Sequence, residues 1–384
     1  MRLTYWIVFI FFLTNCNSPT PIEVSSGAGI IPHEAIANHA MKLLKDPLFS
    51  SLSIGVTFDG KKHIAHFGEI DKGQNNKPTD NTVYEIASVT KTLLAVLVSQ
   101  AEIEGKLSLD DDIRKYLDGD FDNLQYKDQP ILIRHLLTHT ASLPRWAPER
   151  VGDLFEDIDS QLPYKINKIL SQYTKAQFFE DLKYLTIEAI PGTHYSYSSY
   201  GTELTTYIIE KIYSKSFDEL ISEKIASKAQ MSDTRIKLNE EQLKRSANGY
   251  DMNGNLTIQM VSNLWGGGGR AKSTPSDLMN YMTFLLDPEN KPAANSYNTL
   301  YDLAPFNGDE NNKSGYFWVL NEDDIFGKKV SHHGGAYGMQ NWLHIYPDTN
   351  LGISVITNNG GMRTSRKLDN LIQKILEEIH KVNS

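Results

Sequence analysis

The sequence predicts an α+β fold in which one antiparallel sheet is built from both ends of the chain. Three observations support this: hairpin patterns near each end, a mostly helical pattern over about residues 88–245, and no strand–helix–strand alternation. A doubly wound parallel sheet requires that alternation, so the sequence argues against it. The helical stretch is expected to form a subdomain inserted into the sheet, with further helices flanking the sheet.

The N-terminal elements are a helix and a hairpin. Residues 33–45 carry apolar side chains at helical spacing and stop before Pro47. Residues 52–58 alternate as strands do, and Asp59-Gly60 is a hairpin turn that leads into a second strand over 63–67.

The C-terminal third returns to strands. Residues 328–330 predict a strand, and residues 342–346 and 351–357 form a second hairpin around Pro347-Asp348. The last helix carries an apolar stripe at helical spacing, formed by Leu368, Leu371, Ile372, Ile375, Leu376 and Ile379.

Composition narrows the class of protein. The 384 residues are 40% hydrophobic and 22% charged, the balance of a globular chain with a sizeable core. A net charge of −9 without a basic block argues against nucleic acid as a partner, because that affinity comes mainly from clustered Lys and Arg. A single cysteine excludes an intrachain disulfide and a cysteine-based zinc cage.

The N-terminus resembles that of a bacterial lipoprotein. The apolar run from Leu3 to Leu13 is too short for a spanning helix, which needs roughly 20 such residues, and it follows a positive end as in a signal peptide. Leu13-Thr14-Asn15-Cys16 resembles a lipobox, in which the cysteine is lipidated. The alternative is an ordinary secretory signal with an incidental cysteine.

This resemblance divides the chain into a signal peptide (1–15), a flexible tether (16–30) and a folded domain (31–384). It implies an exported protein held at the bacterial cell envelope by a lipid on Cys16, with the membrane as a partner.

A candidate nucleophile and base lie at the start of a helix. Ser88 and Lys91 are three residues apart, so they share one face of the helix that continues over 93–101. A serine hydroxyl is a poor nucleophile alone, and a neutral lysine beside it can take its proton. The helix N-terminus also lowers the cost of a developing anion. The alternative is a serine cap beside a solvated lysine.

Residues 191–201 supply a candidate proton relay. This turn-rich stretch holds three tyrosines, Tyr195, Tyr197 and Tyr200, and a phenol can relay protons beside a lysine. The alternative is aromatic packing over the core.

A glycine-containing run supplies a candidate binding edge. His332, His333, Gly334 and Gly335 follow the strand expected over 328–330. Adjacent glycines at a strand edge let a substrate lie against bare backbone N–H groups. The alternative is a glycine-rich turn with two surface histidines.

In this order, the three segments resemble the serine β-lactamase and penicillin-binding protein superfamily. More narrowly, they resemble the β-lactamase-related branch that includes class C-type enzymes, esterases and D-aminopeptidases. The resemblance runs from about residue 52 to residue 358 and includes the segments 105–111, 133–140, 143–144 and 267–278. It implies the β-lactamase/penicillin-binding fold.

The resemblance also assigns roles. It implies that Ser88 is the acylated nucleophile, Lys91 its proton acceptor and Tyr197 the tyrosine of a Tyr-x-Asn motif. His332-His333-Gly334 stands where Lys-Thr-Gly or His-x-Gly is found, and the N–H groups of Ser88 and Gly335 would form the oxyanion hole.

Two residues depart from the family pattern. Ser199 replaces the usual asparagine, which shortens the arm that would hold a substrate amide and steady Lys91. His332 replaces a lysine that would attract a substrate carboxylate; we expect this imidazole to gain a proton only below about pH 6.5. Both departures weaken the expectation of β-lactam turnover and of D-Ala-D-Ala recognition.

The sequence therefore predicts a lipid-anchored serine hydrolase that uses no cofactor and acts on esters or on small amides and peptides. The alternatives are a D-Ala-D-Ala carboxypeptidase or β-lactamase-type activity, and a catalytically feeble penicillin-binding-like sensing lipoprotein. Loops such as residues 146–165 are expected to form walls of the cleft.

Other site types are disfavoured by the motifs. His135 and His139 have the spacing of zinc ligands but lack the glutamate of H-E-x-x-H, so we expect no metal site. Residues 266–269 lack the ending of a phosphate loop, and no G-x-S-x-G elbow occurs.

Overall fold

The computed structural model describes residues 29–156, 158–303 and 311–384. Cys16, the expected signal peptide and most of the expected tether lie outside these residues. Where the described chain begins, the backbone N–H of Ile30 donates to the side chain of Asn383 at 2.8 Å, so its two ends lie together. Within the described ranges, no helix is long and apolar enough to cross a bilayer.

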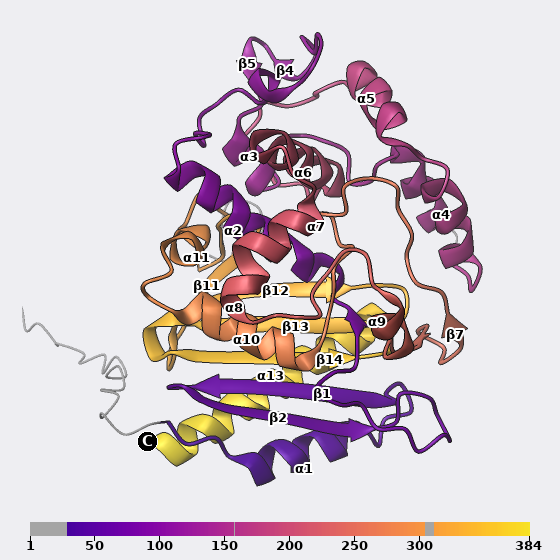
Figure 1. The fold of residues 1–384 in the computed structure, drawn as a ribbon, viewed down its shortest axis with the longest axis vertical. Coiled ribbons are helices and arrows are strands. Elements are labelled where there is room, and N and C mark those ends of the chain that lie inside the picture. The colour runs from indigo at the N-terminus through magenta and orange to yellow at the C-terminus, as the bar shows by residue number, and fades with distance from the viewer. Residues whose placement is uncertain (1–28, 157, 304–310) are drawn as a thin grey trace, which may run out of the picture.

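An eight-stranded antiparallel sheet forms the base of the molecule (Figure 1). Its strand order is β2-β1-β14-β13-β12-β11-β10-β9. The strands are β1 (Ser51–Phe58), β2 (Lys61–Gly68), β9 (Tyr301–Asp302), β10 (Lys313–Ser314), β11 (Val319–Asp323), β12 (Gly327–Gly335), β13 (Gln340–Tyr346) and β14 (Leu351–Thr357). β1 pairs directly with β14, with Ile54 opposite Val355, so the predicted sheet from both chain ends is confirmed.

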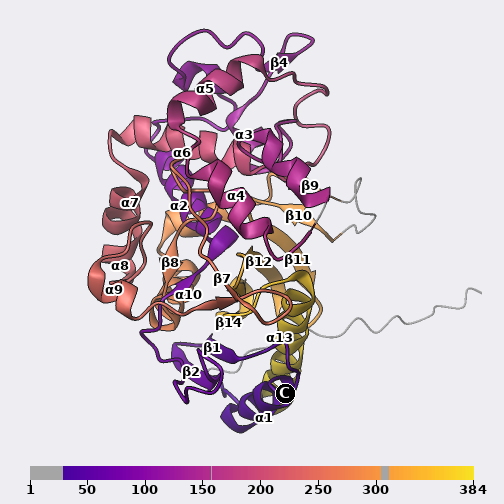
Figure 2. The same cartoon turned by 90° about the vertical axis from the view of Figure 1, so that its right-hand side faces the viewer.

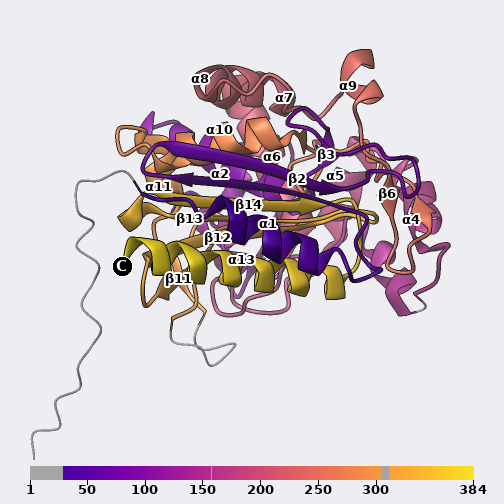
Figure 3. The ribbon, with the colours of Figure 1, turned by 90° about the horizontal axis from the view of Figure 1, so that it is seen from below.

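Helices cover both faces of this sheet. α1 (His33–Leu43) and α13 (Met362–Asn383) run side by side beneath it (Figure 3). α10 (Pro275–Leu286) packs on the opposite face against β1 and β14. All eight residues of β1 are therefore buried, polar and apolar alike.

The helical part stands above the sheet (Figure 2). Its helices are α2 (Thr90–Ile103), α3 (Ile133–Leu137), α4 (Leu162–Leu170), α5 (Lys175–Tyr184), α6 (Ser199–Tyr213), α7 (Phe217–Leu220), α8 (Ser227–Ala229) and α9 (Glu240–Lys244), and α11 (Lys291–Ser296) packs on α2. Three two-stranded ladders accompany them: β3 (Tyr84–Glu85) with β8 (Lys272–Ser273), β4 (Gln125–Tyr126) with β5 (Gln129–Pro130), and β6 (Gly249–Tyr250) with β7 (Leu256–Thr257).

Strand β12 is longer than the sequence predicts. The strand continues through Gly335, which lies opposite Gln340 of β13, so the alternative of a glycine-rich turn at His332–Gly335 is wrong. On its other side β12 pairs with β11 only as far as Ser331, opposite Val319. Over the described residues, β12 beyond Ser331 therefore has an edge that no strand occupies.

Candidate active site

Ser88 lies in a short 3₁₀ turn, Ala87–Val89, between β3 and α2. The side chain of Asn341 in β13 fixes this turn to β12, because its Nδ2 donates to the carbonyls of Ile86 and Gly334, each at 3.1 Å. Gly334 permits this close approach: a Cβ there would lie 2.2 Å from the Ile86 oxygen. The turn and the β12 edge are thus held together by contacts that a side chain at residue 334 would prevent.

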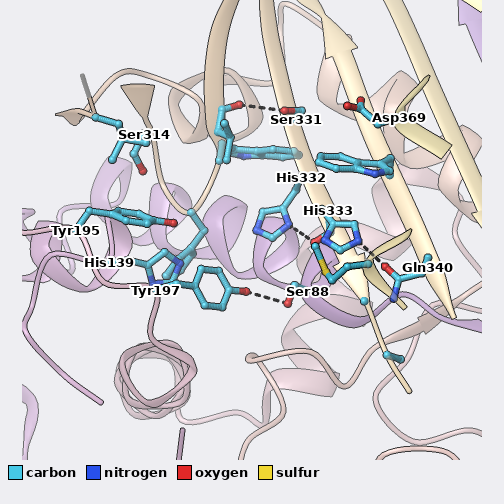
Figure 4. A pocket seen from close by; sticks show the side chains of 18 of the residues that line it. Ser88, His139, Tyr195, Tyr197, Ser314, Ser331, His332, His333, Gln340 and Asp369 are labelled. Atoms are coloured by element: carbon cyan, nitrogen blue, oxygen red, sulfur yellow. Dashed lines mark hydrogen bonds between the residues drawn. The ribbon is translucent and has the colours of Figure 1, made fainter. Parts of the chain in front are cut away.

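Three of the predicted residues meet at one oxygen. Lys91 Nζ donates to Ser88 Oγ at 3.2 Å. The Tyr197 hydroxyl donates to the same oxygen at 2.9 Å, as Figure 4 shows. Lys91 is fully buried, and its Nζ lies 5.0 Å from the centre of the Tyr197 ring. This arrangement places two proton-carrying groups within reach of one hydroxyl.

Lys91 is held by a backbone carbonyl. Its Nζ also donates to the carbonyl of Gly268. The loop that carries Gly268 is fastened to α6 by Glu203, whose Oε1 accepts from the Gly268 N–H at 3.0 Å and whose Oε2 accepts from the Gly266 N–H at 2.8 Å. Sequence reasoning missed Glu203, because the Gly266–Gly268 loop that it holds meets α6 only in the folded chain.

Ser199 does not make the side-chain contact with Lys91 that is expected of the asparagine it replaces. It begins α6, and its backbone N–H donates to the Arg145 carbonyl at 2.9 Å. Within the described chain its hydroxyl has no hydrogen bond to Lys91, which agrees with the expected loss of that arm; the Gly268 carbonyl is the partner of Lys91 instead.

Tyr197 is positioned by His139. From the sequence this residue was considered as one of two possible zinc ligands. The His139 carbonyl accepts from the Ser196 N–H at 2.8 Å, and its Nδ1 accepts from the Ser198 N–H at 3.2 Å. Its ring packs against the Tyr197 ring with centres 4.4 Å apart. The backbone of His139 is left-handed, with φ 56°, a conformation that costs energy for a residue with a Cβ.

The imidazole of His139 is neutral. Burial lowers its pKa well below the usual range, and the nearby charge of Lys91 lowers it further. Because Nδ1 accepts a hydrogen bond, Nε2 carries the proton, and this N–H has no hydrogen-bond partner in the described parts of the chain.

The other two tyrosines of the segment do not reach Ser88. Tyr200 is buried, and its hydroxyl donates to the Phe178 carbonyl at 2.9 Å. Tyr195 lines the cavity, and burial raises its pKa to about 12. Neither has a described hydrogen bond to the Ser88 hydroxyl, so proximity in sequence does not make them substitutes for Tyr197.

The prediction that His332 gains a proton below about pH 6.5 is wrong. His332 is 5% exposed, and burial, reinforced by the charge of Lys91, lowers its pKa to about 3. Its Nδ1 lies 2.8 Å from the His333 carbonyl, so Nδ1 donates the proton and Nε2 is a free acceptor. His332 therefore supplies no positive charge near neutral pH.

His333 also lines the main cavity, although its side chain leaves β12 on the face opposite to that of His332. Its Nε2 pairs with Gln340 Oε1 at 2.7 Å, and its ring packs on Trp342 with centres 4.8 Å apart. Gly335, the next position on that face, lines the cavity beside Ser88.

The main cavity has a volume of about 580 Å³ and contains Ser88, Tyr197, His332 and Gly335 in its lining. Aromatic side chains make up much of the remaining wall, namely Tyr195, Phe317, Trp318, Tyr337 and Trp342. Of the expected wall at residues 146–165, Trp146 and Ala147 line a second, smaller cavity that also borders Ser88.

The histidine pair weighed as a metal site is engaged elsewhere. His135 Nδ1 accepts from the Leu132 N–H at 3.1 Å, whereas the His139 ring contacts Tyr197. In the ranges that the structure covers, no cluster of three or more His, Cys, Asp or Glu side chains is arranged to hold a metal ion.

Comparison with known proteins gives a consistent result. The sequence model of the Beta-lactamase family matches residues 37–377. Protein flp of Staphylococcus aureus (strain MRSA252) is 26% identical over 316 residues, which cover 81% of this chain and 59% of that protein. Penicillin-binding protein 4* of Bacillus subtilis (strain 168) is 27% identical over 300 residues, covering 73% of this chain and 62% of that protein. The chain thus spans about 60% of the length of these curated relatives.

Solved structures share the fold. A β-lactamase/D-alanine carboxypeptidase from Yersinia pestis, complexed with citrate, aligns with a TM-score of 0.75 at 20% identity and covers 90% of this chain and 97% of its own. A class C β-lactamase aligns with a TM-score of 0.73 at 21% identity, covering 90% and 97%.

Proposed function

Because the chain belongs to the β-lactamase family, we propose that it is a serine hydrolase that forms an acyl-enzyme on Ser88. The observation that carries this proposal is that Ser88 Oγ lies 3.2 Å from Lys91 Nζ and 2.9 Å from the Tyr197 hydroxyl. A structural serine cap requires neither neighbour.

In the acylation step, Ser88 Oγ attacks the substrate carbonyl carbon and gives its proton to Lys91, a transfer that uses the unprotonated form of this amine. As the bond between the carbonyl carbon and the leaving group breaks, Tyr197 gives its hydroxyl proton to the leaving group, and the proton on Lys91 is passed to Tyr197. The backbone N–H groups of Ser88 and Gly335 stabilise the oxyanion; one such donor is worth about 3–4 kcal/mol in acyl-transfer enzymes.

The proposed substrates are esters or small amides and peptides. His332 is neutral, so a substrate carboxylate meets no cation at this position. Ester cleavage needs less proton donation from the site than amide cleavage, because an alkoxide leaves more readily than an amine.

One observation favours the second candidate, a D-Ala-D-Ala carboxypeptidase or β-lactamase-type activity. Arg145 lines the main cavity, with its guanidinium 5.5 Å from the Tyr197 ring, and within the described residues it forms no ion pair. This cation offers a carboxylate of the substrate a partner that His332 does not. The names of two relatives, a penicillin-binding protein and a carboxypeptidase, point the same way for those proteins.

We also propose that the protein is anchored at the bacterial cell envelope by a lipid on Cys16. Support comes from the apolar run that precedes Cys16 and from its being the single cysteine in the sequence. The tether would then join the lipid to a domain whose described part begins beside the C-terminal helix.

An active-site-directed aryl phosphonate tests the function. It should add one covalent mass to a peptide that contains Ser88, and Ser88→Ala should abolish both the labelling and the hydrolysis of short acyl esters. A label on a different serine would contradict the assignment of the nucleophile. A parallel panel of esters, D-Ala-D-Ala peptides and penicillins separates the two candidate activities.

A further inference from the structure

A second cavity lies next to Ser88. It measures about 110 Å³ and shares Ser88 and Gly335 with the main cavity. A water molecule needs roughly 10–15 Å³ of such space, so the cavity has room for water. Among its other lining residues are Ser199, Glu203 and Arg270, so a carboxylate and a guanidinium border the same space as the proposed nucleophile.

Glu203 and Ser199 both line this space. The two residues are four apart on α6 and therefore lie on one face of the helix. Glu203 is 6% exposed, and it is the carboxylate among the residues that line this cavity. A buried carboxylate is costly unless it is bonded or has a function, so its position requires an explanation.

The carboxylate of Glu203 retains capacity to accept hydrogen bonds. Its two oxygens accept from the Gly266 and Gly268 N–H groups, and the Trp265 N–H also stabilises the charged form. Even with all three N–H groups counted, one of about four lone-pair positions is left. Burial raises its pKa, whereas these N–H groups and Lys91 oppose that rise. A base with a raised pKa is a better proton acceptor than an ordinary exposed carboxylate.

Arg270 supplies a second reason to expect water in this cavity. Its Nη1 is buried and has no hydrogen-bond partner in the parts of the chain described; its nearest acid, Glu85, lies 3.9 Å away. A buried donor of this kind is commonly satisfied by ordered water.

We propose that Glu203 is the general base that activates the hydrolytic water when the Ser88 acyl-enzyme is cleaved. This inference rests on the proposed function, since it requires an acyl-enzyme. The water gives one proton to Glu203 while its oxygen bonds to the acyl carbon, and the oxyanion forms beside the N–H groups of Ser88 and Gly335. The carbon–Oγ bond then breaks, Oγ takes a proton from Tyr197 or Lys91, and the proton on Glu203 restores that group. The acid product leaves.

The competing explanation is purely structural. Through the Gly268 loop, Glu203 also fixes the carbonyl that accepts from Lys91. In that case its loss would slow acylation and deacylation together, whereas loss of a deacylation base slows only the second step.

The test is a stopped-flow comparison of the full-length wild type and Glu203→Gln with a p-nitrophenyl ester. We expect the variant to release the first equivalent of nitrophenol at a rate close to that of the wild type, and its steady-state turnover to fall by about 10²–10⁴. Intact mass spectrometry should show the acyl group accumulating on Ser88. Hydroxylamine, which needs less proton removal than water, should restore turnover of the variant and give a hydroxamate.

The matched control is Glu85→Gln, which removes another buried carboxylate near Arg270 that does not line this cavity. It should accumulate no acyl-enzyme. Equal slowing of the burst and of steady-state turnover in Glu203→Gln would overturn the proposal, as would failure of hydroxylamine to restore turnover.

Two further outcomes are distinguishable. If Glu203→Gln does not fold, Ser199→Leu tests the same space, because the longer apolar side chain displaces water while the carboxylate remains; acyl-enzyme should accumulate, and unchanged deacylation would overturn the proposal. If the wild type forms no Ser88 adduct with any ester or phosphonate, the proposed function itself has failed.

Discussion

The Tyr197 hydroxyl donates a hydrogen bond to Ser88 Oγ across 2.9 Å, although the two residues are 109 positions apart in the chain. Ser88 is placed by the turn that Asn341 fixes to β12, and Tyr197 by its contacts with His139. The site therefore depends on two separate supports, one on the sheet and one in the helical part.

The first prediction concerns the proton carriers. Lys91→Met and Tyr197→Phe should each lower kcat for ester hydrolysis by about 10²–10⁴, because each removes a group that is hydrogen-bonded to Ser88 Oγ. Tyr195→Phe is the matched control, since Tyr195 lines the cavity without a described bond to Ser88. Stopped-flow measurement of the acylation rate checks this; the same loss in Tyr195→Phe would mean that the relay is assigned to the wrong tyrosine.

The second prediction concerns His139. Replacing it with Phe leaves the buried Ser198 N–H without its acceptor, which should reduce the free energy of unfolding by about 1–3 kcal/mol and lower kcat through displacement of Tyr197. His139→Asn retains an acceptor near Nδ1 and should recover part of both losses. Urea unfolding and ester kinetics measure the two effects. Equal behaviour of the Phe and Asn variants would show that the acceptor is irrelevant and that ring packing alone matters.

Local patterns predicted the sheet and the pairing of Ser88 with Lys91 well. The hairpin at Asp59-Gly60 and the strand over 351–357 follow from turn residues and apolar runs, and both are present in the sheet. Ser88 and Lys91 were readable because their pairing is a matter of helical spacing alone. The tertiary surroundings of β1 were not readable in this way. Its residues are buried by α10 on one face and by a core shared with α13 on the other, and both helices come from distant parts of the chain.

The same reason explains the errors at His332 and the omission of Glu203. The pKa of an imidazole depends on its surroundings. His332 lies in β12 and Lys91 in α2, and no local sequence pattern shows that these two elements come together in the fold. The Gly266–Gly268 loop meets α6 only in the folded chain, so the role of its carbonyl and of Glu203 has no local signature.

The third prediction follows from the pKa of His332, which burial lowers from 6.5 to about 3. The unfolded chain binds a proton at this residue below about pH 6.5 and the folded chain does not, so acid favours unfolding. Between pH 7.5 and pH 5 this difference should cost about 2 kcal/mol of stability, since one pKa unit is about 1.4 kcal/mol.

Unfolding by urea at the two pH values measures this cost. His332→Gln should lose less stability on acidification than the wild type, whereas His380→Gln, a change at the end of α13, should behave as the wild type does. His139 and His344 shift in the same direction and contribute in every variant. An identical pH dependence in His332→Gln and the wild type would show that His332 is not buried in its neutral form.

The fourth prediction is lipidation of Cys16. The full-length protein should incorporate labelled palmitate and partition into detergent when expressed in a bacterial host, because a thioether-linked lipid requires the thiol. Cys16→Ser should do neither and should retain its signal peptide or be released. Cleavage at a site other than the bond before Cys16 would contradict the anchor, and the domain would then be secreted by an ordinary signal.

The last prediction is the substrate preference. With a neutral imidazole at residue 332 and no amide arm at residue 199, we expect measurable hydrolysis of short acyl esters and slow turnover of penicillins and cephalosporins. Acidification through pH 6.5 should not raise activity toward carboxylate substrates, because His332 stays neutral there. His332→Lys should improve kcat/KM for carboxylate-bearing substrates by about 10- to 100-fold, since a charge-assisted hydrogen bond is worth roughly 1.5–3 kcal/mol. Neutral esters serve as the matched substrate and should gain nothing from the lysine. If the wild type turns over cephalosporins efficiently and leaves esters intact, Arg145 rather than residue 332 supplies the cation, and Arg145→Gln should then abolish that activity.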